Sequence, residues 1–292
     1  MTNKFQYRFS GLNISSDLCL QLINESSFRS KPDLEIKYDP KIKTNNDKKA
    51  FLCNLNKTTL NYPGVGAINI EKNGELLTYN YVKRNLNFLS KIINHGIGYS
   101  YYQRRKLALH GSAVKVDKCA VLFMGESGTG KSSILAALSE NLECLSDDTI
   151  GFDCDNGGVS LHPGLNYFKI DQAIADEIRI NKEKIVTNDD RGRSFYESSN
   201  EVSMRIPVKS CYILRWGDDD TIKEIDNPKE KIAAFLHSAY TCFPLNSCIE
   251  SASLLIDFSS FFFKNVKMYY FIRKKGNILK NTEMLIKHIN DS

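Results

Sequence analysis

A glycine-rich motif in the middle of the chain constrains the fold more than any other feature. Residues 125–132 read GESGTGKS and match the pattern G-x-x-x-x-G-K-[S/T] at every fixed position. The apolar run 120–124 precedes the motif, and a segment with an apolar helical face (Ile134, Leu135 and Leu138) follows it. A strand, a glycine-rich turn and a helix in this order are the flanks that a phosphate-binding loop requires. The motif therefore predicts a strand–loop–helix unit that binds phosphate.

The motif also predicts specific contacts with a nucleoside triphosphate. Glycines let the backbone curl so that successive N–H groups point at phosphate oxygens, and the helix that begins near Lys131 adds the positive end of its dipole. We expect Lys131 to reach the β- and γ-phosphates and the Ser132 hydroxyl to bind Mg²⁺, with ATP as the nucleotide. The alternative is a glycine-rich turn that carries a lysine by chance. The residues expected to contact the nucleotide are Gly125, Glu126, Ser127, Gly128, Thr129, Gly130, Lys131, Ser132 and Ser133.

Two adjacent carboxylates, Asp147 and Asp148, follow the motif after one predicted helix and one short predicted strand at residues 143–145. If that strand is parallel to the strand before the motif, its C-terminal end returns to the phosphate side of the sheet. One carboxylate would then organise Mg²⁺ or its waters, and the other would accept a proton from an attacking hydroxyl. The alternative is a surface turn, since Asp is common where strands end. His110 lies on the preceding strand, and its spacing alone is typical of a core histidine.

The chain is predicted to divide into two regions. Residues 1–105 are expected to form a β-rich N-terminal subdomain ending in a helix at 85–105, which His95 and Gly96 interrupt. Residues 106–292 are expected to form an α/β domain that contains the motif. The predicted strands are Phe5–Phe9, Leu34–Tyr38, 50–55, 67–71, 76–82, Leu107–Val116, Cys119–Met124, 210–216 and 266–272. The predicted helices of the second region lie at 132–140, 172–180, 229–240 and 282–289.

Composition and charge narrow the class of protein. The 292 residues, 42% hydrophobic and 25% charged, are enough for a substantial core. There is no run of eighteen apolar residues and no apolar signal-peptide core at the N-terminus, so we expect a cytoplasmic protein without a membrane span. The net charge of +5 is spread along the chain, which fits an anionic ligand and does not indicate nucleic acid. The eight cysteines lack zinc spacing and are expected to be small buried hydrophobes. The oligomeric state is left open.

Three separated elements resemble the catalytic core of the HPr kinase/phosphorylase family in order and spacing. They are the segment that begins His110-Gly111, the glycine-rich motif, and the pair Asp147-Asp148. The resemblance covers residues 107–150 and implies a P-loop kinase core of the phosphoenolpyruvate-carboxykinase-like type. It implies that Lys131 binds phosphate and that Ser132 binds Mg²⁺ beside Asp147. It also implies that Asp148 accepts the proton of a substrate serine and that His110 lies near the phosphates.

The chain also resembles HPr-kinase-like proteins found beside genes for ribosomal peptides, including lasso-peptide kinases. The similar segments are YRFSGLNISS at residues 7–16, LHGSAV at 109–114 and the turn PGL at 163–165. This resemblance implies that the acceptor is a serine of a peptide or protein. The family's later signature, with a metal-site glutamate and a substrate-side arginine, is not found. The charged residues in that stretch are expected in a solvated loop; they are Arg191, Arg193, Glu197 and Glu201.

Three functions are compatible with these features. The first is a Mg-ATP-dependent kinase acting on a serine hydroxyl of a peptide or protein, and the second is a kinase of the same fold acting on a small metabolite. The third is a nucleotide-dependent interaction module without chemistry. The presence of His110, Asp147 and Asp148 favours a kinase, because a binding module does not need a base aimed at an acceptor. Reversal of the phosphorylation is less expected, since the later signature is not found.

Overall fold

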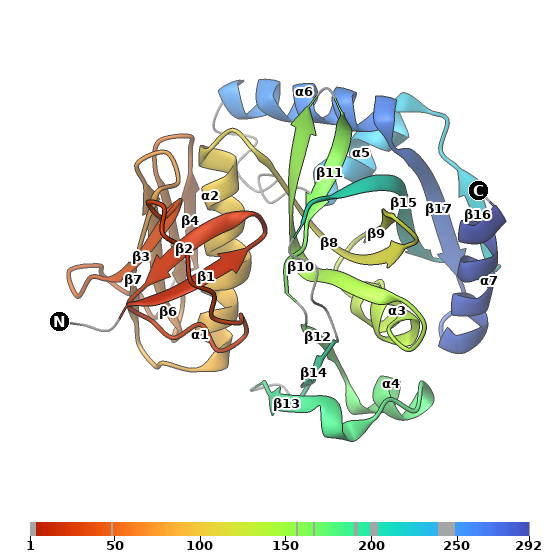
Figure 1. Cartoon of the computed structure of the whole chain (residues 1–292), viewed down its shortest axis with the longest axis horizontal. Coiled ribbons are helices and arrows are strands. Elements are labelled where there is room, and N and C mark those ends of the chain that lie inside the picture. The colour runs from red at the N-terminus through yellow and green to blue at the C-terminus, as the bar shows by residue number, and fades with distance from the viewer. Residues whose placement is uncertain are drawn as a thin grey trace.

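The structure is a computed structural model that describes residues 4–47, 49–155, 157–165, 167–189, 192–198, 204–238 and 249–291. It is a mixed α/β protein with three sheets. Figure 1 shows a β-rich part formed by the first strands, an α/β part formed by most of the remaining chain, and a small sheet below the α/β part. Several candidate residues from the sequence, such as His110, Lys131 and Asp148, lie where these three pieces meet.

The first sheet contains seven strands in the order β1-β2-β3-β7-β6-β5-β4. Strands β2, β3 and β7 are parallel to one another, and the other neighbours are antiparallel. Side chains alternate between the two faces, so that Ile68 and Ile70 of β6 are buried together with Leu77 and Tyr79 of β7. The strands are β1 (Phe5–Phe9), β2 (Leu12–Ser16), β3 (Leu34–Tyr38), β4 (Ala50–Cys53), β5 (Thr58–Tyr62), β6 (Gly66–Glu71) and β7 (Leu76–Tyr81).

The five strands predicted in this region are confirmed to within two residues at their ends. Two further strands, β2 and β5, were not predicted because their sequences, LNISS and TTLNY, are rich in polar residues. The buried polar groups among them are bonded, as at Ser16, where the hydroxyl accepts from the backbone N–H of Leu18 at 3.0 Å. A polar strand is stable here because local hydrogen bonds satisfy its side chains.

The helix predicted at residues 85–105 is confirmed, but its hydrogen bonding changes in the middle. It consists of α1 (Leu86–Lys91), a π-helical turn η1 (Ile92–Gly96) and α2 (Ile97–Gln103). The Asn85 side chain caps its start by accepting from the N–H of Phe88 at 3.0 Å. The interruption predicted at His95 and Gly96 therefore marks a change of helix type. A π-helical turn rotates the side chains that follow it, and such turns are frequent at functional sites.

The second sheet contains seven strands in the order β11-β10-β8-β9-β15-β17-β16. Neighbours β9, β15 and β17 are parallel, and the others are antiparallel. Alternate residues of β9 enter two different cores: Leu122 joins Phe235 and Phe262 of α5 and α6, whereas Phe123 joins helices α3 and α7. The elements are β8 (Leu107–Val116), β9 (Cys119–Met124), α3 (Lys131–Leu138), β10 (Glu143–Asp155), β11 (Gly158–His162), β15 (Ile206–Trp216), β16 (Thr221–Glu224), α5 (Pro228–Ser238), α6 (Ile249–Asn265), β17 (Lys267–Arg273) and α7 (Ile278–Asp291).

The predicted strands and helices of this region are confirmed, with one correction at residues 143–145. The strand predicted there is confirmed at its start, but its length is wrong: β10 begins at Glu143, runs on to Asp155 and carries Asp147 and Asp148 in its interior. It pairs antiparallel with β8, opposite Ser112 and Gly111, so β8 separates it from β9. The apolar and β-branched residues after the carboxylates, such as Ile150 and Phe152, extend the strand into the core. The turn alternative for the two carboxylates is therefore also wrong.

A third sheet, not predicted, lies below the glycine-rich motif (Figure 1). Its strands are β12 (Tyr167–Ile170), β14 (Ser194–Glu197) and β13 (Ile185–Asn188), in that order and antiparallel. The helix α4 (Gln172–Glu177) and the 3-10 turn η2 (Lys182–Lys184) connect β12 to β13. Each strand has four residues, which is too short for a clear alternating pattern.

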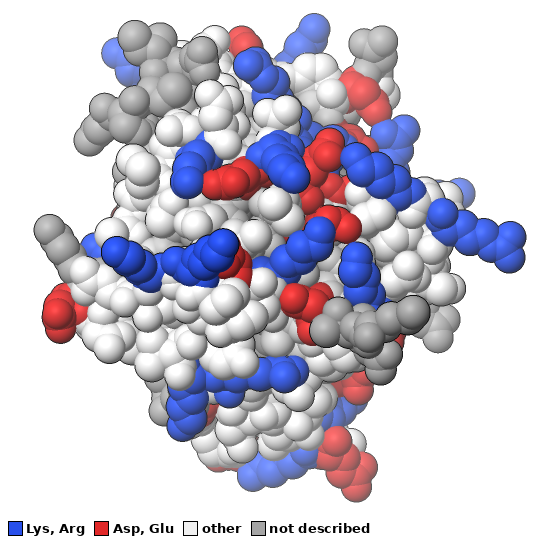
Figure 2. Space-filling model, turned by 90° about the vertical axis from the view of Figure 1, so that its left-hand side faces the viewer, with Lys and Arg blue, Asp and Glu red and all other residues white. Residues whose placement is uncertain are grey.

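In the described part of the chain the charges are mixed as expected, but the cysteines follow the expectation only in part, because Cys19, Cys119 and Cys154 are partly exposed. Figure 2 shows basic and acidic side chains interspersed over the face formed by the first sheet, where Lys31 lies 3.2 Å from Glu75. Cys53, Cys144 and Cys211 are buried free thiols, and Cys242 and Cys248 lie outside the described residues. The predicted end of α5 at Tyr240 also lies outside them. Among the described helices, none is long and apolar enough to cross a membrane.

The contact between α2 and β10 provides a test of how the two larger parts pack. A Cβ added at Gly151 would lie 2.4 Å from the ring carbon Cζ of Tyr101. We expect Gly151→Ala to displace this buried ring and to destabilise the protein by about 1–3 kcal/mol, measured by urea unfolding. The control is Gly157→Ala in the exposed turn after β10, where the nearest atom is Asp155 Oδ1 at 3.1 Å. Equal stabilities of the two variants would contradict the packing of α2 on β10.

Candidate functional site

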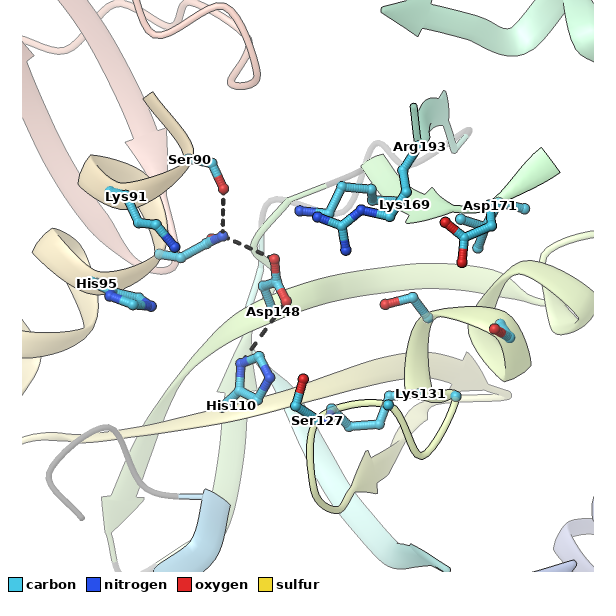
Figure 3. Close-up of a pocket in the computed structure, with 16 residues that line it drawn as sticks. Ser90, Lys91, His95, His110, Ser127, Lys131, Asp148, Lys169, Asp171 and Arg193 are labelled. Carbon is cyan, nitrogen blue, oxygen red and sulfur yellow. Dashed lines mark hydrogen bonds and ion pairs between the residues drawn. The ribbon is translucent and has the colours of Figure 1, made fainter. Parts of the chain in front are cut away.

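A cavity of about 330 Å³ lies between the glycine-rich motif, strands β8 and β10, the helix that follows the first sheet, and the third sheet. Figure 3 shows the side chains of these elements converging from different parts of the chain. The cavity brings together residues that were predicted from the sequence and residues that were not predicted. Its lining consists of Ser90, Lys91, Asn94, His95, His110, Ser127, Gly128, Gly130, Lys131, Ser132, Ser133, Asp148, Lys169, Ile170, Asp171 and Arg193.

The motif forms a tight loop between β9 and α3. Gly125, Gly128 and Gly130 have φ angles of 142°, 85° and 80°, which only glycine adopts readily. Helix α3 begins at Lys131, and its N-cap Gly130 provides no side-chain hydrogen bond to the first N–H groups. Those N–H groups lie at the cavity, so the helix start has the backbone donors and the dipole that favour an anion.

Two side chains outside the motif hold the loop from its outer side. The Trp216 indole N–H donates to the Gly128 carbonyl at 3.2 Å, and the Arg273 guanidinium donates to the Thr129 carbonyl. Arg273 is 2% exposed and stacks on the Trp216 ring, with 4.3 Å between its Cζ and the ring centroid. Trp216 ends one predicted strand and Arg273 directly follows another, but the sequence gave no sign that they reach the loop. The loop is therefore supported by the ends of β15 and β17.

Lys131 lies folded across its own loop. Its ammonium donates to the carbonyls of Gly125 at 2.9 Å and Glu126 at 3.1 Å. Burial lowers the pKa of Lys131, while the nearby carboxylates of Asp147 and Asp148 oppose that shift. An anionic ligand inside the loop would replace these two neutral acceptors by charged ones, which makes stronger hydrogen bonds.

Asp147 lies behind the loop and is 4% exposed. Its Oδ1 accepts from the hydroxyls of Ser112 at 2.6 Å and Ser132 at 3.1 Å. Burial, followed by the charge of Asp148, raises the pKa of Asp147 to about 6. The Ser132 hydroxyl and this carboxylate, the two groups expected from the sequence to bind Mg²⁺, are thus neighbouring oxygen donors.

One hydroxyl and one carboxylate suit Mg²⁺, and they are too few for a metal ion whose ligands all come from the protein. Mg²⁺ in nucleotide sites takes one or two carboxylates and completes its shell with phosphates and water. In the described part of the chain, no group of three or more His, Cys, Asp or Glu side chains can hold a metal ion. Ser132 and Asp147 would therefore supply only part of the coordination.

Asp148 faces the cavity, on the opposite side of the β10 backbone from Asp147. Its φ of 69° is a left-handed conformation that is unusual for a residue within a strand. The Asn94 amide donates to its Oδ2 at 2.9 Å, and His110 Nδ1 lies 3.9 Å from its Oδ1. Burial acts to raise the pKa of Asp148, but His110, Lys169 and Lys131 outweigh it and hold that pKa below its usual value. The carboxylate is therefore ionised at neutral pH.

His110 forms the wall of the cavity next to Asp148 and Ser127 (Figure 3). It lies on β8 opposite Thr149 of β10. Burial lowers the pKa of His110, and the charge of Asp148 only partly opposes this shift. A neutral imidazole at neutral pH can donate one hydrogen bond and accept another. The spacing-based alternative, a histidine enclosed in the core, is wrong because this ring lines a cavity.

The cavity also contains residues that sequence reasoning missed or misplaced. Asn94 was missed, although the helix interruption at His95 marked its position. Lys169 was missed because β12 was not predicted. Arg193 was expected in a solvated loop, but it lines the cavity and its Nη2 lies 2.7 Å from Asp189 Oδ2. Glu197 is exposed at the end of β14, and Arg191 and Glu201 lie outside the described residues.

Comparisons with known proteins add a distant structural likeness. No protein-family model matches the chain, and no curated protein matches it. Among solved structures, it is similar to the Hpr(Ser) kinase/phosphatase from Coxiella burnetii at 12% sequence identity, covering 63% of this chain and 95% of that chain. The TM-score is 0.31, so this likeness carries no weight in assigning a function.

The raised pKa of Asp147 predicts that this carboxylate costs the ligand-free protein stability. Its pKa of about 6 in the folded state exceeds the ordinary value of 3.8, so the cost appears as pH rises from about 4 to 6 and persists above that. We expect Asp147→Asn to raise the free energy of unfolding at pH 7 by about 3 kcal/mol, and to have little effect near pH 4. Urea unfolding in chelator measures this. The control is Asp155→Asn, at an exposed position of the same strand, which should not stabilise the protein. A lower free energy of unfolding for Asp147→Asn at pH 7 would contradict the raised pKa of Asp147.

Proposed function

We propose that this protein is a Mg-ATP-dependent kinase that transfers the γ-phosphoryl group to a serine hydroxyl of a peptide or protein. The observation that carries this proposal is the arrangement of Lys131 and Asp148 on the same cavity. A loop suited to phosphate and an ionised carboxylate, aimed into one space, are the two requirements for moving a phosphoryl group onto a hydroxyl.

The nucleotide end of the proposed site is the motif. The backbone N–H groups of residues 127–133 and the Lys131 ammonium would bind the phosphates, and Ser132 with Asp147 would hold Mg²⁺. When bound, Mg²⁺ neutralises charge on the β- and γ-phosphates. The outer contacts from Trp216 and Arg273 keep the loop in shape, so little reorganisation is needed when the nucleotide binds.

The acceptor end of the proposed site is Asp148. The acceptor hydroxyl oxygen forms a bond to the γ-phosphorus as the bond between that phosphorus and the β–γ bridging oxygen breaks, and ADP leaves with the bonding electron pair. The proton of the hydroxyl moves to the Asp148 carboxylate, which is ionised at neutral pH and oriented by the Asn94 amide. Lys131 stabilises the charge on the phosphoryl oxygens, and His110 is positioned beside Asp148 to donate a hydrogen bond.

The first test is intact-mass spectrometry of peptide and protein acceptors after incubation with Mg²⁺ and ATP. We expect the wild-type protein to add one phosphate, about 80 mass units, to a serine peptide. Asp148→Asn should retain nucleotide binding but lose transfer by at least about 100-fold, because the base is removed. Lys131→Ala should weaken nucleotide binding itself.

Asp155→Asn is the matched control, since it makes the same chemical change at the exposed end of the same strand. Full transfer by Asp148→Asn would overturn the assigned role. Transfer only to a small hydroxyl compound would keep the kinase and replace the acceptor. Nucleotide binding with no transfer to any acceptor would leave a binding module.

Asn94 is expected to position the base. It donates to Asp148 at 2.9 Å and also to the Ser90 hydroxyl at 3.2 Å, while the Thr149 hydroxyl donates to its backbone carbonyl at 3.1 Å. We expect Asn94→Ala to lower kcat about tenfold with the KM for ATP unchanged, because the carboxylate loses one hydrogen bond. Steady-state kinetics measure this. An unchanged kcat in a variant of normal stability would show that Asp148 does not depend on Asn94.

A further inference from the structure

A second cavity, of about 430 Å³, borders the outer side of the glycine-rich motif, and we call it the outer cavity. Gly125, Glu126 and Thr129 of the motif line it, together with the end of β15 and with α5. The main cavity, of about 330 Å³, instead contains the start of α3. Figure 1 shows α3 and α5 on opposite sides of the second sheet, so the loop lies between the two cavities.

The outer cavity is mainly apolar. Ile213 and Leu214 of β15 and Ala234 of α5 are buried at its wall. The main cavity, in contrast, is lined by charged side chains such as Lys131 and Asp148. Phosphates and Mg²⁺ suit the charged cavity, whereas a nucleobase, a flat heterocycle with apolar faces, suits the apolar one. The two ends of a nucleotide thus have chemically matching cavities on the two sides of one loop.

Trp216, the only tryptophan of the chain, lines the outer cavity and is 38% exposed. Arg273 stacks on one face of the indole ring and does not line the cavity. The side of the ring that lines the cavity is therefore the side that Arg273 leaves uncovered. An aromatic face beside an apolar cavity is a stacking surface for a flat ring, and every nucleobase has such a face.

Trp216 also connects the two cavities. Its indole N–H donates to the carbonyl of Gly128 at 3.2 Å, and Gly128 lines the main cavity. The start of the loop packs closely on β15, because a Cβ added at Gly125 would lie 2.8 Å from the Leu214 carbonyl oxygen. The distance between the ring and the loop is therefore fixed. A nucleotide whose phosphates lie in the motif needs to cross only this edge of the loop for its base to reach the ring.

We propose that the outer cavity binds the nucleobase of the triphosphate, with the base stacked on Trp216. This inference rests on the proposed function, because the phosphates that bring the base there are those bound by the motif. The stacked base completes a layered arrangement in which the Arg273 guanidinium covers the other face of the indole. The Glu126 carboxylate and the His237 imidazole, both exposed at the cavity, provide hydrogen-bonding groups for the polar edge of the base.

The first experiment uses the wild-type protein and its own fluorophore. Because Trp216 is the only tryptophan, tryptophan fluorescence reports on this ring alone. A stacked base quenches indole fluorescence, so we expect Mg-ADP to lower the signal. Mg-pyrophosphate, which fills the motif without a base, should leave the signal unchanged. An equal response to the two ligands, or no response to Mg-ADP that calorimetry shows to be bound, would overturn the proposal.

Calorimetry on variants separates the stacking ring from the support that it gives to the loop. Trp216→Phe and Trp216→Leu both lose the N–H bond to Gly128, but only phenylalanine keeps an aromatic face. We expect wild type and Trp216→Phe to bind Mg-ADP at least about tenfold more tightly than Mg-pyrophosphate, and Trp216→Leu to lose most of that preference. Ala233→Phe, which fills the cavity from α5, should lose it as well. The control Tyr38→Leu, at an exposed aromatic residue of the first sheet, should behave as wild type.

The same preference in Trp216→Phe and Trp216→Leu would overturn the stacking. Adenosine that still binds to protein saturated with Mg-ADP would assign the cavity to a separate ligand and overturn the proposal, whereas displacement of adenosine by Mg-ADP would support it. A base preference that depends on Trp216, without transfer to any acceptor, would support the nucleobase site and count against the kinase. Transfer from ATP by a protein whose two Trp216 variants bind Mg-ADP alike would support the kinase and overturn the nucleobase site.

Discussion

The hydrogen bond between the Asn94 amide and the Asp148 carboxylate joins the two larger parts of the molecule at the point where the candidate site is built. Asn94 belongs to the helix that packs on the first sheet, and Asp148 belongs to the second sheet. The Thr149 hydroxyl adds a second bond to the Asn94 carbonyl at 3.1 Å. Because these groups are largely buried, a displacement of the helix would leave polar groups without partners. The Asp148 carboxylate would then lose the hydrogen bond that orients it. The position of the first sheet therefore determines the geometry of the site.

Strand β10 concentrates unfavourable features in a few residues, and its neighbours compensate for them. Asp147 is buried with a raised pKa, and Asp148 has a left-handed backbone conformation. Ser112 and Ser132 bond to the first carboxylate, and Asn94 bonds to the second. Arg273 adds another cost on the far side of the loop, since it is a buried cation whose Nε is without a hydrogen-bond partner in the described structure. Strain and buried charge of this kind persist where the surrounding structure requires them, and they gather at functional sites.

Local patterns predicted much of this structure because their causes are local. The motif requires glycines with positive φ at Gly128 and Gly130, and the continuous apolar run of β9 requires a strand with a core on both faces. The length of β10 was not predictable in the same way, because two charged residues interrupt its pattern and only pairing with β8 keeps them in the strand. Asn94, Lys169 and Arg193 reach the cavity through tertiary packing of three separate elements, which no spacing in the sequence records. The segments 7–16 and 163–165 do meet, through a bond from Ser10 N to the Pro163 carbonyl at 3.1 Å.

The division of the site between the parts of the chain has a physical consequence for selectivity. The motif and its supports lie on the second sheet, and in the proposed function their backbone donors would bind the triphosphate. Ser90 and Lys91 come from the helix after the first sheet, and Lys169 and Arg193 come from the third sheet. If the proposed function holds, these side chains face the acceptor, and substitutions on the helix or the third sheet would alter what is bound without disturbing the loop. Strand β10 lies between the motif and these side chains, because Asp147 accepts from Ser132 of the motif and Asp148 accepts from Asn94 of the helix. A single strand therefore fixes the distance between the motif and the side chains that come from the helix and the third sheet.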